Sequence, residues 1–228
     1  MQRHFDEELQ QLKEKLLRMS SLVEEIIATS LKALLDRDVK LAERVIHEDK
    51  AIDMFEIEID ELSLRLLALY QPQAGDLRFI TSSMKINNDL ERIGDLAVNI
   101  AHRTLDLIKI PPLKSLSDIL QMANAAQAML RDSLNAFVNK DPALAEEVCK
   151  RDDVVDNFNH QIFIKLLTDK LKDHEGIERA IDLILVAKNL ERIADHATNI
   201  AEDVIFFVEG KTIKHHVLEQ TAGPDPII

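Results

Sequence analysis

Residues 90–101 read LERIGDLAVNIA and residues 190–201 read LERIADHATNIA, so nine of twelve positions are identical at an offset of 100. A second pair of stretches matches at ten of 24 positions at an offset of 103, namely SLKALLDRDVKLAERVIHEDKAID at 30–53 and SLNAFVNKDPALAEEVCKRDDVVD at 133–156. The change in offset falls between the two blocks, where a connection absorbs it. Self-similarity of this kind indicates a tandem duplication.

Each copy has the pattern of three long helices. In the first copy, apolar residues recur at intervals of three and four, which is the spacing of one helix face, along 9–27, 45–66 and 86–100. Charged or proline-containing breaks end these segments, at 36–38, 71–76 and 111–112. The second copy repeats the plan. Its Asp141-Pro142 suits a helix start with proline at the first helical position, and its next break falls at 172–176.

The composition supports a fold made of long helices. Five Gly and six Pro among 228 residues leave little material for β-turns, and 30% charged residues beside 46% hydrophobic ones are typical of long helices. We predict an all-α fold of six long helices, arranged as two tandem-duplicated antiparallel three-helix bundles. The expected boundaries are 1–112 for the first bundle, 113–212 for the second and 213–228 for a loose C-terminal tail.

The charge and the termini exclude several classes of protein. Against 28 basic residues stand 41 acidic ones, a net charge of −13, and no basic run is present. Nucleic-acid binding is therefore not expected, nor is a bare phosphate site without a bound cation. The opening MQRHFDEELQ lacks the apolar core of a signal peptide, and no window holds 18 uninterrupted apolar residues. We expect a cytoplasmic protein without a membrane span.

Pairs of carboxylates four residues apart recur in both copies. Such residues share one face of a helix and repel each other unless a cation or a basic neighbour lies between them. Counted from the turns near residues 73 and 174, the two pairs of each copy fall at nearly the same height on neighbouring antiparallel helices. Four carboxylates are therefore expected to converge once per bundle: Asp49, Asp53, Glu91 and Asp95 in the first, and Asp152, Asp156, Glu191 and Asp195 in the second.

The helical phase places these carboxylates on the surface of each bundle. The apolar stripe along 86–100 is centred roughly opposite Asp95, with Glu91 at its flank. This position suits a surface metal site and an ordinary solvated acidic face equally well. Spacing alone favours the solvated face, because such motifs are common in acidic helices, but recurrence in both copies makes the two interpretations equally supported. An all-oxygen site poor in histidine suits hard or intermediate cations such as Mg, Mn, Ca or Fe.

Side chains next to the acidic pairs also have two interpretations. Arg92 and Arg192 are expected to form salt bridges with neighbouring acids, the alternative being an anion held beside a metal. Asn199 is expected to hydrogen-bond the acidic cluster or to ligate. His196 is expected to be a surface or capping residue, because a lone histidine on a helix seldom ligates. The apolar VIFFV at 204–208 is expected in the core, with a dimer contact as the alternative.

At these residues the sequence resembles the PhoU family. The resemblance covers about 5–215 and includes HEDKAID, KRDDVVD, QPQAGDLR, the two LERI stretches and the closing FFVEGK. It implies a pair of three-helix bundles related by duplication. It also implies a cytoplasmic regulator that links the phosphate-specific ABC transporter, through its ATPase subunit, to a sensor histidine kinase. Such a regulator represses the phosphate-starvation response when phosphate is ample.

The same resemblance implies further properties of the chain. Family members with these motifs hold multinuclear metal clusters on the bundle surface, and all eight acidic motif positions are present here. Fe, Mn, Mg and Zn are the candidate metals, with no organic cofactor. We also expect a homodimer that reaches the membrane only through its partners.

The sequence argues against one other class of helical protein and leaves a second open. A ferritin-like di-iron enzyme uses Glu-x-x-His motifs that project into a four-helix core, but no Glu in this chain is followed by His three residues later. A P-loop and a dinucleotide fingerprint are also absent from the sequence. We therefore predict that the chain is not an enzyme. A metal-free helical adaptor that regulates another membrane transporter is the remaining alternative.

Overall fold

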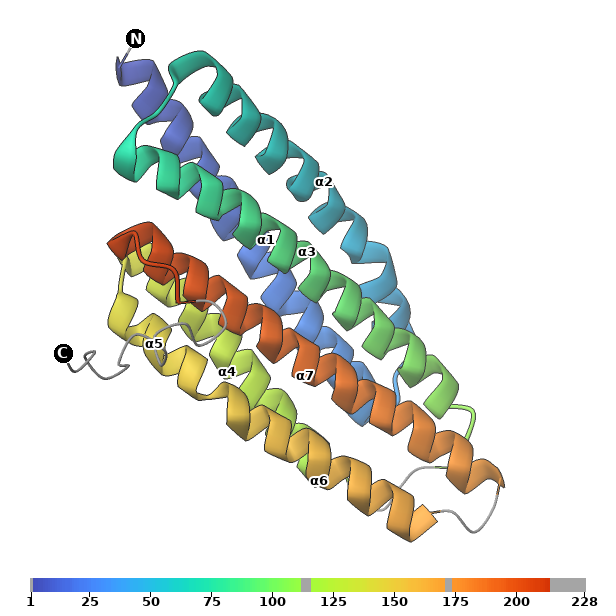
Figure 1. The fold of residues 1–228 in the computed structure, drawn as a ribbon. Helices are drawn as coiled ribbons and strands as arrows, with labels where there is room; N and C mark the ends of the chain where they lie inside the picture. The colour runs from blue at the N-terminus through green and yellow to red at the C-terminus, as the bar shows by residue number, and fades with distance from the viewer. Residues whose placement is uncertain (1, 112–115, 171–173, 214–228) are drawn as a thin grey trace, which may run out of the picture.

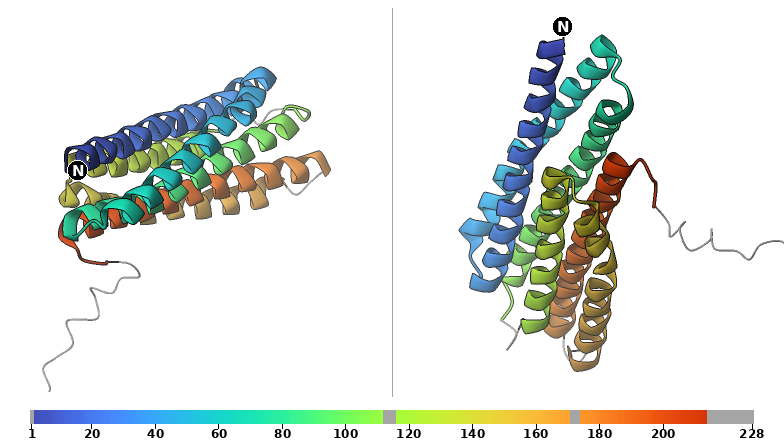
Figure 2. Two further views of the ribbon diagram at one scale, coloured as in Figure 1. Left: turned by 90° about the horizontal axis from the view of Figure 1, so that it is seen from above. Right: turned by 90° about the vertical axis from the view of Figure 1, so that its left-hand side faces the viewer.

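The structure, a computed structural model, describes residues 2–111, 116–170 and 174–213. Within these ranges it consists of helices and short connections: α1 (Gln2–Asp36), α2 (Val39–Tyr70), α3 (Ala74–Leu107), α4 (Ser117–Asn139), α5 (Pro142–Lys150), α6 (Asp152–Lys170) and α7 (His174–Glu209). The long helices run nearly along a common direction, and α1–α3 and α4–α7 form two groups that lie side by side (Figure 1). The two further views show an elongated molecule (Figure 2).

The predicted pair of antiparallel three-helix bundles is confirmed, with one added feature. The second helix of the second copy is interrupted at Arg151, so it is present as α5 and α6. The amide N–H of Arg151 donates to the carbonyl oxygen of Val148, 2.9 Å away, and this closes the end of α5. The predicted boundary at 112–113 lies outside the described residues, as does the predicted tail after Ile213.

In each copy, one aspartate caps the start of the second helix. Asp38 Oδ1 accepts hydrogen bonds from the amides of Lys40 and Leu41, at 2.8 and 3.2 Å. Asp141 caps α5 in the same way, with Pro142 in the first turn. These carboxylates satisfy amides that have no partner inside the helix. The break predicted at 36–38 and the helix start predicted at Asp141-Pro142 are confirmed.

The core is built almost entirely from aliphatic side chains. The apolar stripe of α3 is buried as its spacing predicts, and α1, α2, α4 and α7 also contribute buried aliphatic side chains to the core. Each fully buried Leu or Ile contributes about 1.5–3 kcal/mol relative to an exposed one. The VIFFV segment at 204–208 belongs to this core, because Val204, Ile205 and Phe207 are buried.

The two bundles meet along α3 and α7, which run antiparallel beside each other (Figure 1). At one end of this interface Phe207 lies against Phe79 and Phe137, with ring centroids 5.4 and 6.1 Å away. Helices α1 and α4 also touch across the two bundles. None of the helices in the described ranges combines the length and the apolarity of a membrane span.

Candidate metal centre

The first acidic cluster lies where α2 packs against α3. Asp49 and Asp53 come from α2, and Glu91 and Asp95 come from α3. Gly94 lies directly opposite Asp49: a Cβ atom at this position would be 3.0 Å from Asp49 Oδ1. The missing side chain lets the two helices approach closely at the height of the cluster. The four predicted residues are thus brought to one level.

The electrostatics of the first cluster show that its members interact. The pKa of Asp49 is raised to about 6, mainly by burial and then by the carboxylates of Asp53 and Asp95. The pKa of Glu91 is also raised, first by burial and then by Asp95, while Arg92 opposes the shift. Negative charges held close together in a partly buried site favour protonation or a bound cation. Electrostatic repulsion among the four carboxylates therefore remains in this cluster.

The second cluster repeats this arrangement between α6 and α7. The pKa of Asp195 is raised to about 6, mainly by burial and then by the neighbouring carboxylates of Asp152, Glu191 and Asp156, while Lys188 opposes the shift. The pKa values of Asp152 and Asp156 are raised as well, in both cases mainly by burial. Each repeat therefore has four neighbouring carboxylates, as the spacing predicts.

Arginine and lysine side chains partly neutralise the clusters. Arg92 Nε lies 3.3 Å from Glu91 Oε2, and Arg92 Nη1 lies 3.4 Å from Asp95 Oδ2. This is the salt bridging expected of Arg92. In the second cluster Lys188 pairs with Glu191.

Some of the cluster carboxylates are already bonded to other side chains of the protein. Asp152 Oδ1, for example, accepts a hydrogen bond from Thr198 Oγ1 at 3.2 Å. Over the described part of the chain, no three His, Cys, Asp or Glu side chains are arranged as a ready ligand set. Ligation by these residues would require rotation of their side chains.

The residues nevertheless fit a hard cation. Glu91 Oε2 is buried and accepts no hydrogen bond, although Arg92 is near. The available donors are carboxylate oxygens, which Mg, Mn and Fe accept. The first cluster therefore contains a buried carboxylate oxygen that accepts no hydrogen bond from the described residues and could bind a cation.

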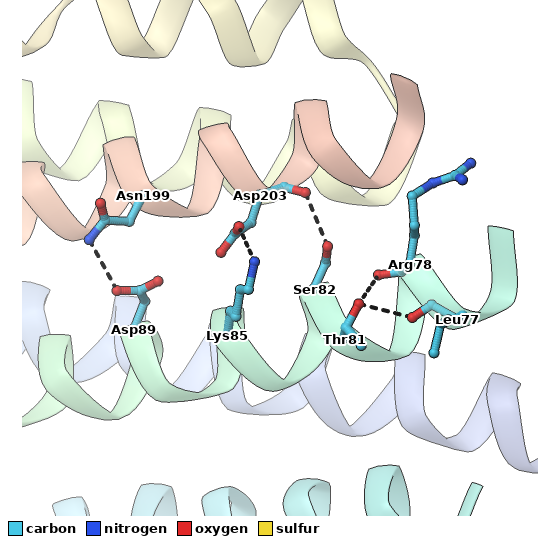
Figure 3. Close-up of polar contacts among 8 residues, drawn as sticks. All are labelled: Leu77, Arg78, Thr81, Ser82, Lys85, Asp89, Asn199 and Asp203. Atoms are coloured by element: carbon cyan, nitrogen blue, oxygen red, sulfur yellow. Dashed lines mark hydrogen bonds and ion pairs between the residues drawn. The ribbon is translucent and has the colours of Figure 1, made fainter. Parts of the chain in front are cut away.

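A buried polar contact between the two bundles was not predicted. His196 Nδ1 on α7 lies 2.8 Å from Asp89 Oδ1 on α3. Asn199 Nδ2 donates to the same oxygen at 3.4 Å (Figure 3). The expectation that His196 is a surface or capping residue is wrong, because its ring faces α3. Asn199 also lies with Asp89, away from the acidic cluster of its own repeat.

The sequence did contain a signal for this contact. At an offset of 100, Asp89 corresponds to Asn189, and His196 corresponds to Leu96. Both members of the pair across the bundles therefore stand at positions where the two copies differ. Closer to the Phe207 end of the interface, Lys85 Nζ pairs with Asp203 Oδ1 at 3.1 Å (Figure 3).

Fold and site together define a class: duplicated all-helical proteins with one surface cluster of carboxylates on each repeat. The PhoU domain matches the chain twice, at residues 16–104 and 119–204, once in each bundle. A phosphate-specific transport system accessory protein PhoU homolog from Aquifex aeolicus is 44% identical over 214 residues, which cover 93% of this chain and 97% of that protein. A homolog of the same name from Caulobacter vibrioides is 40% identical over 210 residues, 92% of this chain and 91% of that protein.

Solved structures agree with this result. PhoU from Pseudomonas aeruginosa has a TM-score of 0.87 and 38% identity, covering 91% of this chain and all of that chain. The phosphate transport system regulatory protein PhoU from Streptococcus pneumoniae has a TM-score of 0.85 and 32% identity, covering 92% of this chain and 99% of that chain. The chain belongs to the PhoU family. This is a family of accessory proteins, so the prediction that the chain is not an enzyme is confirmed, and an accessory or regulatory role in phosphate transport is supported.

Proposed function

We propose that this protein represses the phosphate-starvation response by coupling the phosphate ABC transporter to its sensor histidine kinase. The observation that carries this proposal is the match of both bundles to the PhoU domain, with close relatives named as transport accessory proteins. The absence of a membrane span from the described helices fits a protein that reaches the membrane through partners, the ATPase subunit and the kinase. Action in the cytoplasm and a homodimeric state are parts of the same proposal.

Deletion of the gene tests this role. In medium rich in phosphate, the deletion strain is expected to express its phosphate-starvation genes, measured as transcript levels, and the complemented strain to keep them silent. A response that stays fully shut in the deletion strain would rule out repression. Affinity capture from phosphate-replete cells then tests the partners: recovery of the transporter ATPase and the kinase is expected.

The proposal includes metal clusters at both acidic sites. The ligands would be Asp49, Asp53, Glu91 and Asp95 in the first bundle, and Asp152, Asp156, Glu191 and Asp195 in the second. A bound cation would supply the positive charge that relieves repulsion among these carboxylates. The ligands of each cluster would come from two neighbouring helices, α2 and α3 in the first bundle and α6 and α7 in the second.

The duplication makes the metal proposal quantitative. Replacing Glu91 and Asp95 together with Ala should remove about half of the bound metal, because the other cluster is built from residues of the other bundle. Unchanged stoichiometry in this variant would refute the assignment. Elemental analysis of protein purified without an affinity tag or added metal provides the measurement.

A metal-free adaptor is the second candidate. It is favoured by one observation: Arg92 and Lys188 already pair with Glu91 and Glu191, which reduces the need for a cation. In that case the tag-free protein would contain no stoichiometric metal, while the effect of gene deletion would persist. The two measurements therefore separate the candidates.

A further inference from the structure

Two cavities lie at opposite ends of the interface between the bundles, and the duplication relates them. One has a volume of about 100 Å³ and includes Arg37 and Arg179 in its lining. The other has a volume of about 340 Å³ and includes Lys140 and Phe79. At the offsets of the repeat, 103 and 100, Arg37 corresponds to Lys140 and Arg179 to Phe79. The cavities are therefore equivalent places with different chemistry.

In the larger cavity, the residue equivalent to Arg179 is part of an aromatic cluster. The ring of Phe79 is stacked on Phe137 at 5.8 Å and meets Phe207 edge-on at 5.4 Å. The counterparts of Phe137 and Phe207 in the smaller cavity are Leu34 and Leu107. The fold therefore accepts an apolar ring at this position, and an arginine there is not required by packing.

In the smaller cavity, Arg179 lies among apolar side chains without a polar partner. Its Nε is buried and forms no hydrogen bond with any described residue, and no ion pair of Arg179 is present in the described part of the chain. Arg37, in contrast, is anchored: its Nη2 donates to the carbonyl oxygens of Leu107, Ile108 and Ile110 at 2.9, 3.0 and 2.6 Å. The guanidinium of Arg37 is therefore fixed by hydrogen bonds, whereas that of Arg179 keeps N–H donors that the described residues do not use.

The charge of this cavity is opposite to that of the whole chain. The described lining contains two arginines and no Asp or Glu, although the chain carries 41 acidic residues against 28 basic ones. A partly buried cation without a counter-charge is destabilising. The N-terminal end of α4 adds to the positive potential, because Leu116 lines the cavity and the helix start has no side-chain cap.

We propose that this cavity binds a small inorganic oxyanion, with Arg179 as the main donor and Arg37 as the second cation. A guanidinium offers a planar fork of N–H donors that matches two oxygens of such an anion. A cavity of about 10–15 Å³ already admits a water molecule, so about 100 Å³ accommodates a tetrahedral oxyanion. The chain's net charge argued against a bare phosphate site, but the local charge here is reversed.

Calorimetric titration of the full-length, metal-free protein with inorganic phosphate tests the proposal. The choice of phosphate as probe rests on the proposed function, and removal of metal prevents binding through the acidic clusters. Titrations at constant ionic strength, with chloride as the reference, are expected to show saturable binding at one site per chain. A parallel titration with sulfate that also saturates, and competes with phosphate, supports a general oxyanion site.

Matched variants come from the repeat itself. Arg179→Phe introduces the residue of the equivalent position and is expected to weaken phosphate binding about tenfold or more, because charge-assisted hydrogen bonds are lost. Arg179→Lys keeps the charge without the fork and should also bind more weakly, which covers the case in which the Phe variant does not fold. Lys140→Ala removes one positive charge at the other end and should bind as the wild type does.

Three results would overturn the proposal. They are the absence of saturable phosphate binding by the wild type at millimolar concentration, unchanged binding by folded Arg179 variants, and equal weakening by Lys140→Ala. A negative titration leaves the regulatory role intact, since gene deletion tests that role separately. A failed deletion test, in turn, says nothing against the cavity.

Discussion

Single carboxylates carry the most unusual electrostatics of this protein. Residue spacing alone predicted that four of them meet in each repeat, because positions four apart share a helix face and the turns fix the relative heights. It did not predict which carboxylate is most perturbed. The large shift of Asp49 arises from burial beside Gly94, which depends on the distance between two helices that are remote in sequence.

The raised pKa of Asp49 makes stability depend on pH. The pKa of this carboxyl in the folded chain, about 6, lies above its ordinary value of 3.8. Its favourable contribution is therefore complete below about pH 4 and is lost as the pH rises through about 6. In metal-free protein, Asp49→Asn should raise the free energy of unfolding by about 1 kcal/mol at pH 7.5, a value reduced for solvent exposure.

Denaturant unfolding at two pH values checks this prediction. Near pH 4.5 the difference between the variant and the wild type should be clearly smaller, because Asp49 is then mostly protonated in the folded chain. The control is Glu43→Gln on the exposed side of α2, which should change little at either pH. A stabilisation by Asp49→Asn that is the same at pH 4.5 and 7.5 would show that ionisation of Asp49 is not its cause.

At the scale of single helices, the boundaries set by capping residues were predictable and one interruption was not. Asp38 and Asp141 are good N-cap residues directly before apolar periodic segments, so α2 and α5 begin where expected. The interruption between α5 and α6 falls at Arg151, where the sequence has neither Gly nor Pro. Arg151 Nη1 donates to Asp132 on α4 at 2.8 Å, a tertiary contact that local sequence does not reveal.

The N-cap of α5 has a measurable effect on stability. Asp141→Ala removes the acceptor of two amide hydrogen bonds and should lower the free energy of unfolding by about 1 kcal/mol. Glu146→Ala, on the exposed face of the same helix, serves as control and should change stability far less. Urea unfolding of both variants provides the comparison, and equal losses would exclude capping as the reason.

At the scale of the whole molecule, the duplication predicted two bundles but not how they meet. The apolar face of α3 is buried inside its own bundle, so the sequence pattern does not distinguish the side that contacts α7. That side is marked by Asp89, Lys85 and Ser82, polar residues that bond with α7 (Figure 3). Their partners lie more than a hundred residues away in the chain.

The Asp89–His196 pair should hold the two bundles together. His196→Leu, which restores the residue of the first repeat, removes one partner of a buried carboxylate and should lower the free energy of unfolding by about 1–3 kcal/mol. Asp89→Asn restores the residue of the second repeat. The double variant should lose less than the sum of the two single variants, since they act on one contact. Additive losses in denaturant unfolding would mean that the two residues do not interact.

The proposed clusters are most directly tested by anomalous X-ray diffraction from crystals of the protein grown with Mn²⁺. We expect one group of anomalous peaks between α2 and α3, in contact with carboxylate oxygens of Asp49, Asp53, Glu91 or Asp95, and a second group at the equivalent place between α6 and α7. Peaks found only elsewhere, or no peaks despite Mn²⁺ in the crystals, would contradict the assignment of these carboxylates as metal ligands.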